Sequence, residues 1–337
     1  MCYQQAAVAP LVLESVKYQI QRYGQGREFQ LIAADDGSTD GSQEVIRSWV
    51  EENRGLFVKT GLLFRGENAG ICRNYVDALR AVEGERFVKV DGDDLLAPYN
   101  VFELTELLSE YDMVCPAFLR FRGAGELVRD CRAYLEVVLQ RFIRGSVLRR
   151  SVKLGCPLAG TAIYRKSLLT PEVYEFILRF RTVNDRACFQ KIITDNRGIR
   201  TCYVNRPVIL YRMSDSSLSS FSSPSRQLHN REIARLCRVQ RESERSPLFR
   251  LLLLAQEKSA AFRMSSSGLV RFFRFFSPYF AIMLGLCARH WGAIRRLERE
   301  LVDGHWQDCA AHYQRMAAEA GAFLRRAGAG KSPENRV

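Results

Sequence analysis

Residues 31–42 read Leu-Ile-Ala-Ala-Asp-Asp-Gly-Ser-Thr-Asp-Gly-Ser, and this stretch decides the fold class. The first four residues form a short apolar run, which is typical of a buried β-strand. An acidic turn follows at Asp35-Asp36-Gly37, and a helix cap is available at Asp40 or Ser42. The stretch therefore predicts a strand, an acidic turn and a helix in immediate succession.

A second acidic turn, Asp91-Gly92-Asp93-Asp94, follows the apolar segment 87–90 about 55 residues later. In open parallel sheets ligands bind at the carboxyl ends of the strands, so both turns are expected to open onto one crevice. Three carboxylates within four residues repel one another unless a cation lies among them, and Mg²⁺ or Mn²⁺ suits such oxygens. The alternative is a pair of solvated turns, because Asp and Gly are good turn formers.

The rest of the first two-thirds alternates short apolar runs with amphipathic stretches, the pattern of an α/β domain with a mostly parallel sheet. A serine-rich segment at 214–225 suggests a boundary, and the chain beyond it has a helical pattern, with separate helices expected at 291–302 and 306–326 near its end. We therefore expect an α/β domain over 1–220 and a helical region over 221–330. The expected strands are Phe29–Ala34, Val58–Phe64, Arg86–Val90, Met113–Phe118, Gly160–Tyr164 and Thr201–Leu210.

The charge is distributed unevenly along the 337 residues, whose formal net charge is +13. The first 120 residues hold 12 Lys or Arg against 19 Asp or Glu, and the remainder holds 38 against 18. This uneven charge argues against a protein that covers nucleic acid with a uniformly basic surface, and no nucleic-acid partner is expected. Ten scattered cysteines, no secretory signal and no uncharged apolar run of spanning length indicate a cytoplasmic protein.

Three segments in this order resemble family 2 of the glycosyltransferases, which have the GT-A fold. They are DDGSTDGS at 35–42, NAGICRN at 68–74 and DGDD at 91–94. The resemblance extends from about residue 3 to about residue 220. It implies a GT-A sheet flanked by helices, with the helical C-terminal region as an extension. It also implies a nucleotide-sugar donor, commonly linked to UDP.

The resemblance assigns nucleotide-binding roles to residues of the first two motifs. Asp35 and Asp36 would hold the base and the ribose, and Tyr3 would stack on the base. Arg73 would face the diphosphate, and Asn68 belongs to the same binding segment.

In the third motif, the resemblance implies a divalent cation, Mn²⁺ or Mg²⁺. Asp91 and Asp93 would hold the cation, Asp91 would also reach the ribose, and Asp94 would support both. Such a cation neutralises the leaving nucleoside diphosphate.

An inverting transfer needs a general base, and histidine occurs only after residue 228. The family places a carboxylate at the start of a helix, usually as a Glu-Asp pair, and the matching residues here are Asn184 and Asp185. We therefore take Asp185 as the candidate base, with a helix N-cap as the alternative role.

Two further departures from the family concern the histidine that often contacts the metal and the first strand. In the segment Tyr211–Ser219, which resembles a family motif, Ser214 replaces the histidine, and Asp215 beside it is another possible ligand. The chain opens at Met1-Cys2-Tyr3, where the family has a longer apolar strand. We expect either a start upstream of Met1 or a sheet without that strand.

Residues 263–299 combine arginines with a dense aromatic and aliphatic pattern. One interpretation is an amphipathic segment lying on an anionic membrane, and the other is a helix packed on the catalytic domain.

The overall hypothesis is an inverting, metal-dependent glycosyltransferase of surface polysaccharide or lipopolysaccharide synthesis, peripheral at the inner face of the membrane. Its acceptor would be a glycan or a lipid-linked molecule. The alternative is a related binding protein that has lost catalysis.

Overall fold

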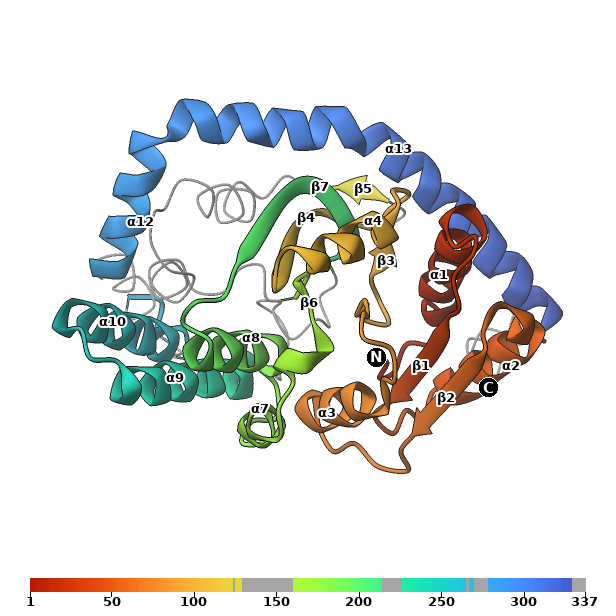
Figure 1. Cartoon of the computed structure of the whole chain (residues 1–337), viewed down its shortest axis with the longest axis horizontal. Coiled ribbons are helices and arrows are strands. Elements are labelled where there is room, and N and C mark those ends of the chain that lie inside the picture. The colour runs from red at the N-terminus through yellow and green to blue at the C-terminus, as the bar shows by residue number, and fades with distance from the viewer. Residues whose placement is uncertain (124, 129–159, 214–225, 265–266, 270–277, 329–337) are drawn as a thin grey trace.

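The N-terminal part forms a two-stranded parallel sheet with helices around it (Figure 1). The computed structural model describes residues 1–123, 125–128, 160–213, 226–264, 267–269 and 278–328. Strand β1 pairs with β2 from Gln30↔Lys59 to Asp35↔Phe64. The elements are α1 (Ala9–Tyr23), β1 (Gln30–Asp35), α2 (Ser42–Glu52), the 3-10 turn η1 (Arg54–Leu56), β2 (Lys59–Phe64) and α3 (Ile71–Ala81).

A second sheet follows, in the order β3-β7-β4-β5, with β6 also on β4. Only the β4–β7 ladder is parallel, and the others are antiparallel, so the parallel character of the fold is partial. The strands are β3 (Leu95–Leu96), β4 (Met113–Arg122), β5 (Glu126–Leu127), β6 (Ile163–Tyr164) and β7 (Thr201–Arg212). The helices are α4 (Val101–Glu106), η2 (Leu107–Ser109), η3 (Lys166–Leu168), α7 (Pro171–Ile177) and α8 (Asn184–Asp195).

Met1 and Cys2 lie between the two sheets. The Cys2 N–H donates to the Ala34 carbonyl at 2.8 Å, and Cys2 forms an isolated parallel bridge with Asp35. On the other side, the Gly92 N–H donates to the Met1 carbonyl at 2.6 Å. The strand expected at Arg86–Val90 is wrong: these residues pair with no strand in the described part of the chain, and the Val90 carbonyl instead accepts from the Met1 amino group at 3.1 Å.

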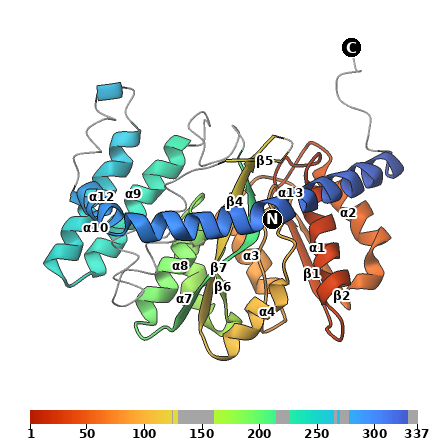
Figure 2. The ribbon, with the colours of Figure 1, turned by 90° about the horizontal axis from the view of Figure 1, so that it is seen from above.

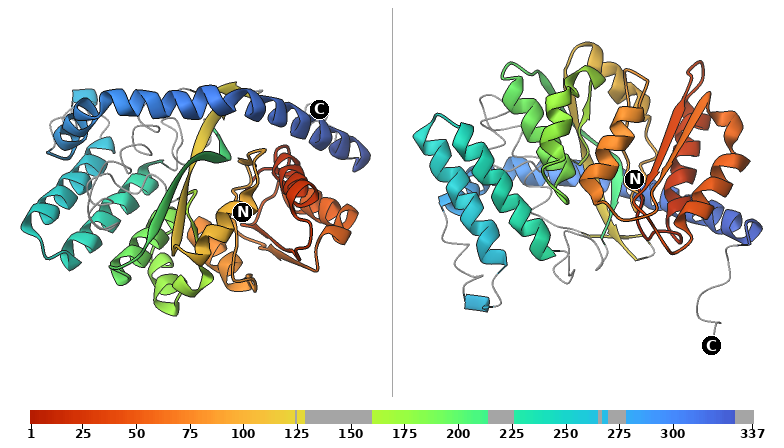
Figure 3. Two further views of the ribbon diagram at one scale, coloured as in Figure 1. Left: turned by 45° about the horizontal axis from the view of Figure 1, so that its top comes forward. Right: turned by 90° about the horizontal axis from the view of Figure 1, so that it is seen from below.

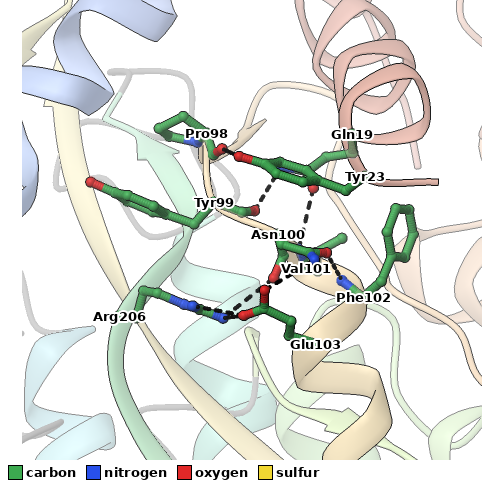
Figure 4. A network of polar contacts seen from close by, with 9 residues as sticks. All are labelled: Gln19, Tyr23, Pro98, Tyr99, Asn100, Val101, Phe102, Glu103 and Arg206. Carbon is green, nitrogen blue, oxygen red and sulfur yellow. Dashed lines mark hydrogen bonds and ion pairs between the residues drawn. The ribbon is translucent and has the colours of Figure 1, made fainter. Parts of the chain in front are cut away.

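A polar network joins the end of α1 to the segment that leaves β3 (Figure 4). The Gln19 amide donates to the carbonyls of Ala97 at 2.6 Å and Tyr99 at 2.9 Å, and its oxygen accepts from the Val101 N–H at 3.2 Å. The Tyr23 hydroxyl donates to the Pro98 carbonyl at 2.8 Å. The network fixes the chain that follows the second acidic turn and satisfies backbone groups away from water.

The described C-terminal region is entirely helical, as expected. The helices are α9 (Arg226–Ser243), α10 (Pro247–Arg263), α12 (Pro278–Arg289) and α13 (Trp291–Arg326). The expected boundary at 220/221 falls within 214–225, outside the described residues. None of the helices in the described ranges is long and apolar enough to cross a membrane.

Helix α13 spans the molecule from α12 to α2, across both sheets (Figures 1 and 2). Two separate helices were expected at 291–302 and 306–326, but the structure has one continuous helix of 36 residues. Leu301 and Met316 belong to the core around β4 and β7, whereas Phe323 packs in the core that contains Trp49. This helix therefore links the two halves of the fold by apolar packing.

Helices α9 and α10 lie side by side next to α8, at the end of the molecule away from β1 and β2 (Figure 3). The Gln190 amide on α8 donates to the Gln240 oxygen on α9 at 2.7 Å. Leu236 of α9 is buried in the main core. The C-terminal helices are thus packed on the α/β part rather than separated from it.

We predict that His312 on α13 makes the fold acid-sensitive. Its Nε2–H donates to the Leu96 carbonyl at 3.1 Å, and Arg315 donates to its Nδ1 at 3.2 Å, so the ring is held neutral. Burial, with the neighbouring Arg315, lowers the pKa of His312 to about 4 from an ordinary 6.5. Its contribution is therefore present above pH 6.5 and is lost as the pH falls toward 4.

Between pH 7 and 5, the wild type should lose about 2 kcal/mol more unfolding free energy than His312→Gln, which keeps a donor and an acceptor but does not titrate. Urea denaturation of both proteins across this range measures the difference. Parallel stability profiles would contradict the neutral, buried state of His312.

Candidate active site

The first acidic turn is held by hydrogen bonds to nearby residues at Asp35 and to a distant segment at Asp36. Asp35 is fully buried and accepts from the Ser38 N–H at 2.8 Å and the Gln43 amide at 2.8 Å. Asp36 is also buried, and its two oxygens accept from the N–H groups of Ala69 and Gly70, each at 2.9 Å. Because a carboxylate accepts about four hydrogen bonds, both retain capacity for a ligand. Their assignment to base and ribose stays a prediction.

The segment Asn68–Gly70 is hydrogen-bonded to Asp36 of the first turn and to Arg181 in the loop that precedes α8. Arg181 donates from Nη2 to the side-chain oxygen of Asn68 at 2.7 Å and to its carbonyl at 3.1 Å. Gly70 has a φ of 96° and a ψ of 148°, and a Cβ there would lie 2.4 Å from Arg181 Cγ. Only glycine adopts this backbone without strain. Arg181 was not identified from the sequence, since Asn68, the partner of its side chain, lies 113 residues away.

Two other predicted nucleotide contacts lie on the surface. Tyr3 is 46% exposed and directly follows the Cys2 bridge. Arg73 is exposed in the first turn of α3. Asn74 beside it is buried, and its side-chain oxygen has no hydrogen-bond partner in the described part of the chain. The positions leave Tyr3 and Arg73 accessible to a ligand, and their roles stay predictions.

In the second acidic turn, the carboxylates differ in their surroundings. Asp91 Oδ2 accepts from Lys89 Nζ at 3.0 Å, whereas Asp91 Oδ1 is buried with no partner among the described residues. Although burial opposes it, Lys89 holds the pKa of Asp91 below its ordinary value. Burial and the charge of Asp91 raise the pKa of Asp93. Burial, with the Asp93 and Asp91 charges, raises the pKa of Asp94 well above its ordinary value.

Arg212, at the end of β7, supports the second turn. Its backbone N–H donates to Asp94 Oδ1 at 3.0 Å, and its Nε donates to the Asp93 carbonyl at 3.0 Å. The guanidinium also lies 4.8 Å from the centre of the Phe121 ring. The segment Tyr211–Ser219 carried a family resemblance that could have pointed to Arg212. Ser214 and Asp215 lie outside the described residues.

Asp185 lies in the first turn of α8, but it is not the N-cap. The N-cap position is Val183, which makes no side-chain cap, so the capping alternative is wrong. Asp185 Oδ1 accepts from Lys89 Nζ at 2.9 Å and from the Asn184 amide at 3.1 Å. Burial raises the pKa of Asp185, although Lys89 partly offsets this effect. The structure therefore brings the candidate base next to the candidate metal ligand Asp91, with Lys89 between them.

Glu232 of α9 holds the loop that leads into α8. Its side chain is buried and accepts from the N–H groups of Arg181 and Thr182, each at 2.6 Å. His229 of the same helix also contacts the Thr182 carbonyl at 3.2 Å. No sequence pattern indicated this role, because Glu232 looks like any polar residue of an amphipathic helix.

The second turn suits a hard divalent cation. The buried Asp91 Oδ1 has no partner in the described part of the chain, and a cation would offset the burial that raises the pKa of Asp93. Among the described residues, no three His, Cys, Asp or Glu side chains form a metal-binding group. Two carboxylates would therefore leave most coordination positions to substrate phosphates and water, as Mg²⁺ commonly does.

The two acidic turns lie on opposite sides of the Met1–Cys2 backbone. Asp36 donates its N–H to the Cys2 carbonyl at 3.0 Å, and Gly92 donates its N–H to the Met1 carbonyl. Both turns are therefore bound to the same two-residue backbone segment, and their opening onto one crevice stays a prediction. The arrangement offers buried acceptors, one unpartnered carboxylate oxygen for a cation and a third carboxylate held by a lysine.

Comparisons with known proteins concern the sequence family and the fold. The sequence pattern described as Glycosyl transferase family 2 matches residues 1–170. Among curated proteins, none matches the chain in sequence. The fold is similar to TarS 1–349 of S. aureus, with a TM-score of 0.52 and 16% identity over 96% of this chain and 89% of that one.

TarS 1–349 in complex with UDP-GlcNAc has a TM-score of 0.53 at 16% identity, covering 97% of this chain and 90% of that one. The mannosyltransferase PcManGT from Pyrobaculum calidifontis, in complex with GDP-Man and Mn²⁺, has a TM-score of 0.48 at 17% identity, covering 98% and 86%. The TarS likeness confirms the GT-A fold.

Gly70→Ala should destabilise the protein by about 3 kcal/mol, because the added Cβ meets Arg181 and the positive φ is strained. Gly66→Ala is the matched control, since a Cβ there meets nothing within 4 Å. It should change the unfolding free energy by less than about 1 kcal/mol. Urea denaturation of the two variants tests the fastening of this segment, and equal stabilities would refute it.

Proposed function

Because the chain belongs to glycosyl transferase family 2, we propose that it transfers a sugar from a nucleotide-sugar donor to a hydroxyl group of a glycan or lipid-linked acceptor. The reaction inverts the configuration at the anomeric carbon. The observation that carries this proposal is the juxtaposition of Asp91 and Asp185 on the two sides of Lys89. Such a pair supplies a cation-binding oxygen and a proton acceptor at one place.

The donor is proposed to be a UDP-sugar. Asp35 and Asp36 are buried acceptors suited to the N–H of a base and the hydroxyls of a ribose, and Tyr3 is exposed for stacking. Asn68 and the cationic, exposed Arg73 belong to the same binding segment, with Arg73 facing the diphosphate. The similarity in fold to TarS, which was solved with UDP and with UDP-GlcNAc, supports this choice.

Asp91 and Asp93 would hold a divalent cation, Mn²⁺ or Mg²⁺, and Asp94 would support them from its bond to the Arg212 N–H. When bound, the cation neutralises the charge that develops on the leaving diphosphate. Asp91 and Asp93, together with the phosphates of the donor, would supply the ligands of this cation.

Asp185 is proposed as the general base. One hydrogen-bonded oxygen fixes its orientation, and burial raises its pKa, which makes it a better proton acceptor near neutral pH. In one step, the acceptor oxygen bonds to the anomeric carbon and its proton passes to Asp185. The bond from that carbon to the diphosphate breaks, and the nucleoside diphosphate leaves with the electron pair.

The acceptor side is proposed to meet the inner face of the cytoplasmic membrane in the synthesis of a surface polysaccharide or lipopolysaccharide. Leu248, Leu251, Leu284 and Trp291 on α10, α12 and α13 are each at least 51% exposed. Residues 247–296 hold eight Lys or Arg and one acidic residue. Apolar side chains with surrounding cations favour an anionic lipid surface.

A second candidate is a binding protein of the same fold that has lost catalysis. The observation that favours it is Asn184, which stands where the family usually has the Glu of its acidic pair. Both candidates bind a nucleotide sugar, and only the first transfers the sugar.

Asp93→Asn and Asp185→Asn separate the proposed role in cation binding from the proposed role in proton transfer. Asp93→Asn should lose most Mn²⁺-dependent UDP binding. Asp185→Asn should bind UDP with Mn²⁺ within about threefold of the wild type and lose transfer by at least about 100-fold, because it cannot accept the proton. Isothermal titration and a radiolabelled-donor assay measure the two effects.

The control is Asp195→Asn, on the same helix as Asp185 and paired with Lys191 on the surface. It should behave as the wild type. A wild type that binds UDP-sugars without transfer or hydrolysis would favour the binding protein. Full transfer by Asp185→Asn would remove that residue as the base.

For the membrane, Leu251→Glu combined with Leu284→Glu should weaken binding to vesicles of phosphatidylglycerol and phosphatidylcholine by at least about tenfold, because the charges oppose insertion. Val58→Glu is the control, since Val58 is 67% exposed and directly precedes β2, which lies at the other end of the molecule from α10 and α12 (Figure 1). Vesicle sedimentation gives the affinities. Equal effects of the two changes would contradict a specific membrane face.

A further inference from the structure

Lys89 is placed between two carboxylates that come from distant parts of the chain. Its Nζ lies 3.0 Å from Asp91 Oδ2 and 2.9 Å from Asp185 Oδ1. The side chain is only 12% exposed, and Nζ lies 5.8 Å from the centre of the buried Tyr75 ring. A lysine held by two carboxylates and an aromatic face has little freedom to adopt another position.

On Asp185, the lysine uses only one of the two oxygens. Oδ1 receives the hydrogen bonds of Lys89 and of the Asn184 amide. Oδ2 receives none from the described residues and faces Gly160, where an added Cβ would lie 3.5 Å from it. Hydrogen bonds to a single oxygen fix the plane of the carboxylate and leave the other oxygen for a proton.

The two carboxylate oxygens of Asp91 differ in the same way as those of Asp185. Oδ2 is bound to Lys89, and Oδ1 is buried without a partner in the described part of the chain. The lysine thus orders both carboxylates and leaves one oxygen on each for the reaction.

Asn184 fits this arrangement better than the usual glutamate of the family. Its amide donates to Asp185 Oδ1, whereas an ionised glutamate has no hydrogen to donate. The departure at Asn184 therefore supplies a second donor to the same oxygen as Lys89.

We propose that Lys89 is a positioning residue that, with Asn184, holds Asp185 Oδ1 and directs Oδ2 toward the hydroxyl of the acceptor. Lys89 touches neither the donor nor the acceptor, and Asp91 Oδ2 is its anchor. This assignment rests on the proposed function, because it assumes that Asp185 is the base.

The experiment compares Lys89→Met, Lys89→Arg and Lys89→Gln with the wild type, using UDP-sugar donors, Mn²⁺ and a glycan acceptor, or donor hydrolysis without one. Lys89→Met should lower kcat by about 100-fold and change the donor KM by less than about threefold, because the base is misaligned. Lys89→Arg keeps the charge and donors and should recover at least about tenfold of that loss. Lys89→Gln is the polar replacement for use if the Met variant does not fold, and should lose at least about tenfold.

Two further measurements separate positioning from general stability. Lys191→Met, which removes a surface lysine paired with Asp195 on α8, should leave kcat unchanged. In an Asp185→Asn background, Lys89→Met should cost less than about threefold, since its effect passes through the base.

A kcat for folded Lys89→Met within twofold of an active wild type would overturn the assignment and leave the proposed function intact. The assignment would also be overturned if Lys89→Met lowered kcat by a further factor of about 100 in the Asp185→Asn background. A kcat of Lys89→Arg no higher than that of Lys89→Met would overturn it as well. A wild type inactive with every nucleotide sugar would overturn the proposed function and this assignment together.

Discussion

The site depends on one constraint: carboxylates must be removed from water at the edge of two sheets without leaving their charges uncompensated. Asp91, Asp93, Asp94 and Asp185 lie where burial favours their neutral forms. Lys89 compensates Asp91 and Asp185, and the Arg212 backbone N–H binds Asp94. The remaining acceptor capacity is what a cation and a nucleotide would use.

The same constraint explains why distant segments meet at the site. Asp36 is satisfied by the N–H groups of Ala69 and Gly70, and Arg181 fastens the segment to the loop before α8. Glu232 of α9 holds that loop in turn. The C-terminal helices therefore support the position of Asp185. Helix α13 adds the apolar link between the two halves.

Local patterns in the sequence were sufficient for much of the fold and for the acidic turns. The strand before Asp35 was predicted to within one residue, because an apolar run ends there at a turn. The strand at Arg86–Val90 was wrong because an apolar run forms a strand only where another strand pairs with it, and none of the described strands pairs with this segment. Lys89, Arg181 and Glu232 were missed as site residues because their roles arise from long-range contacts that leave no local pattern. The break expected within α13 was wrong because packing along both cores outweighs the weak helix propensity of Gly304.

The most direct test of the central claim is the position of Mn²⁺ in crystals grown with UDP, read from its anomalous diffraction. The account predicts a single strong peak within coordination distance of Asp91 Oδ1 and Asp93, with the UDP diphosphate on its other side and Lys89 still on Asp91 Oδ2. UDP bound without a metal peak at these carboxylates, or a peak elsewhere, would contradict it.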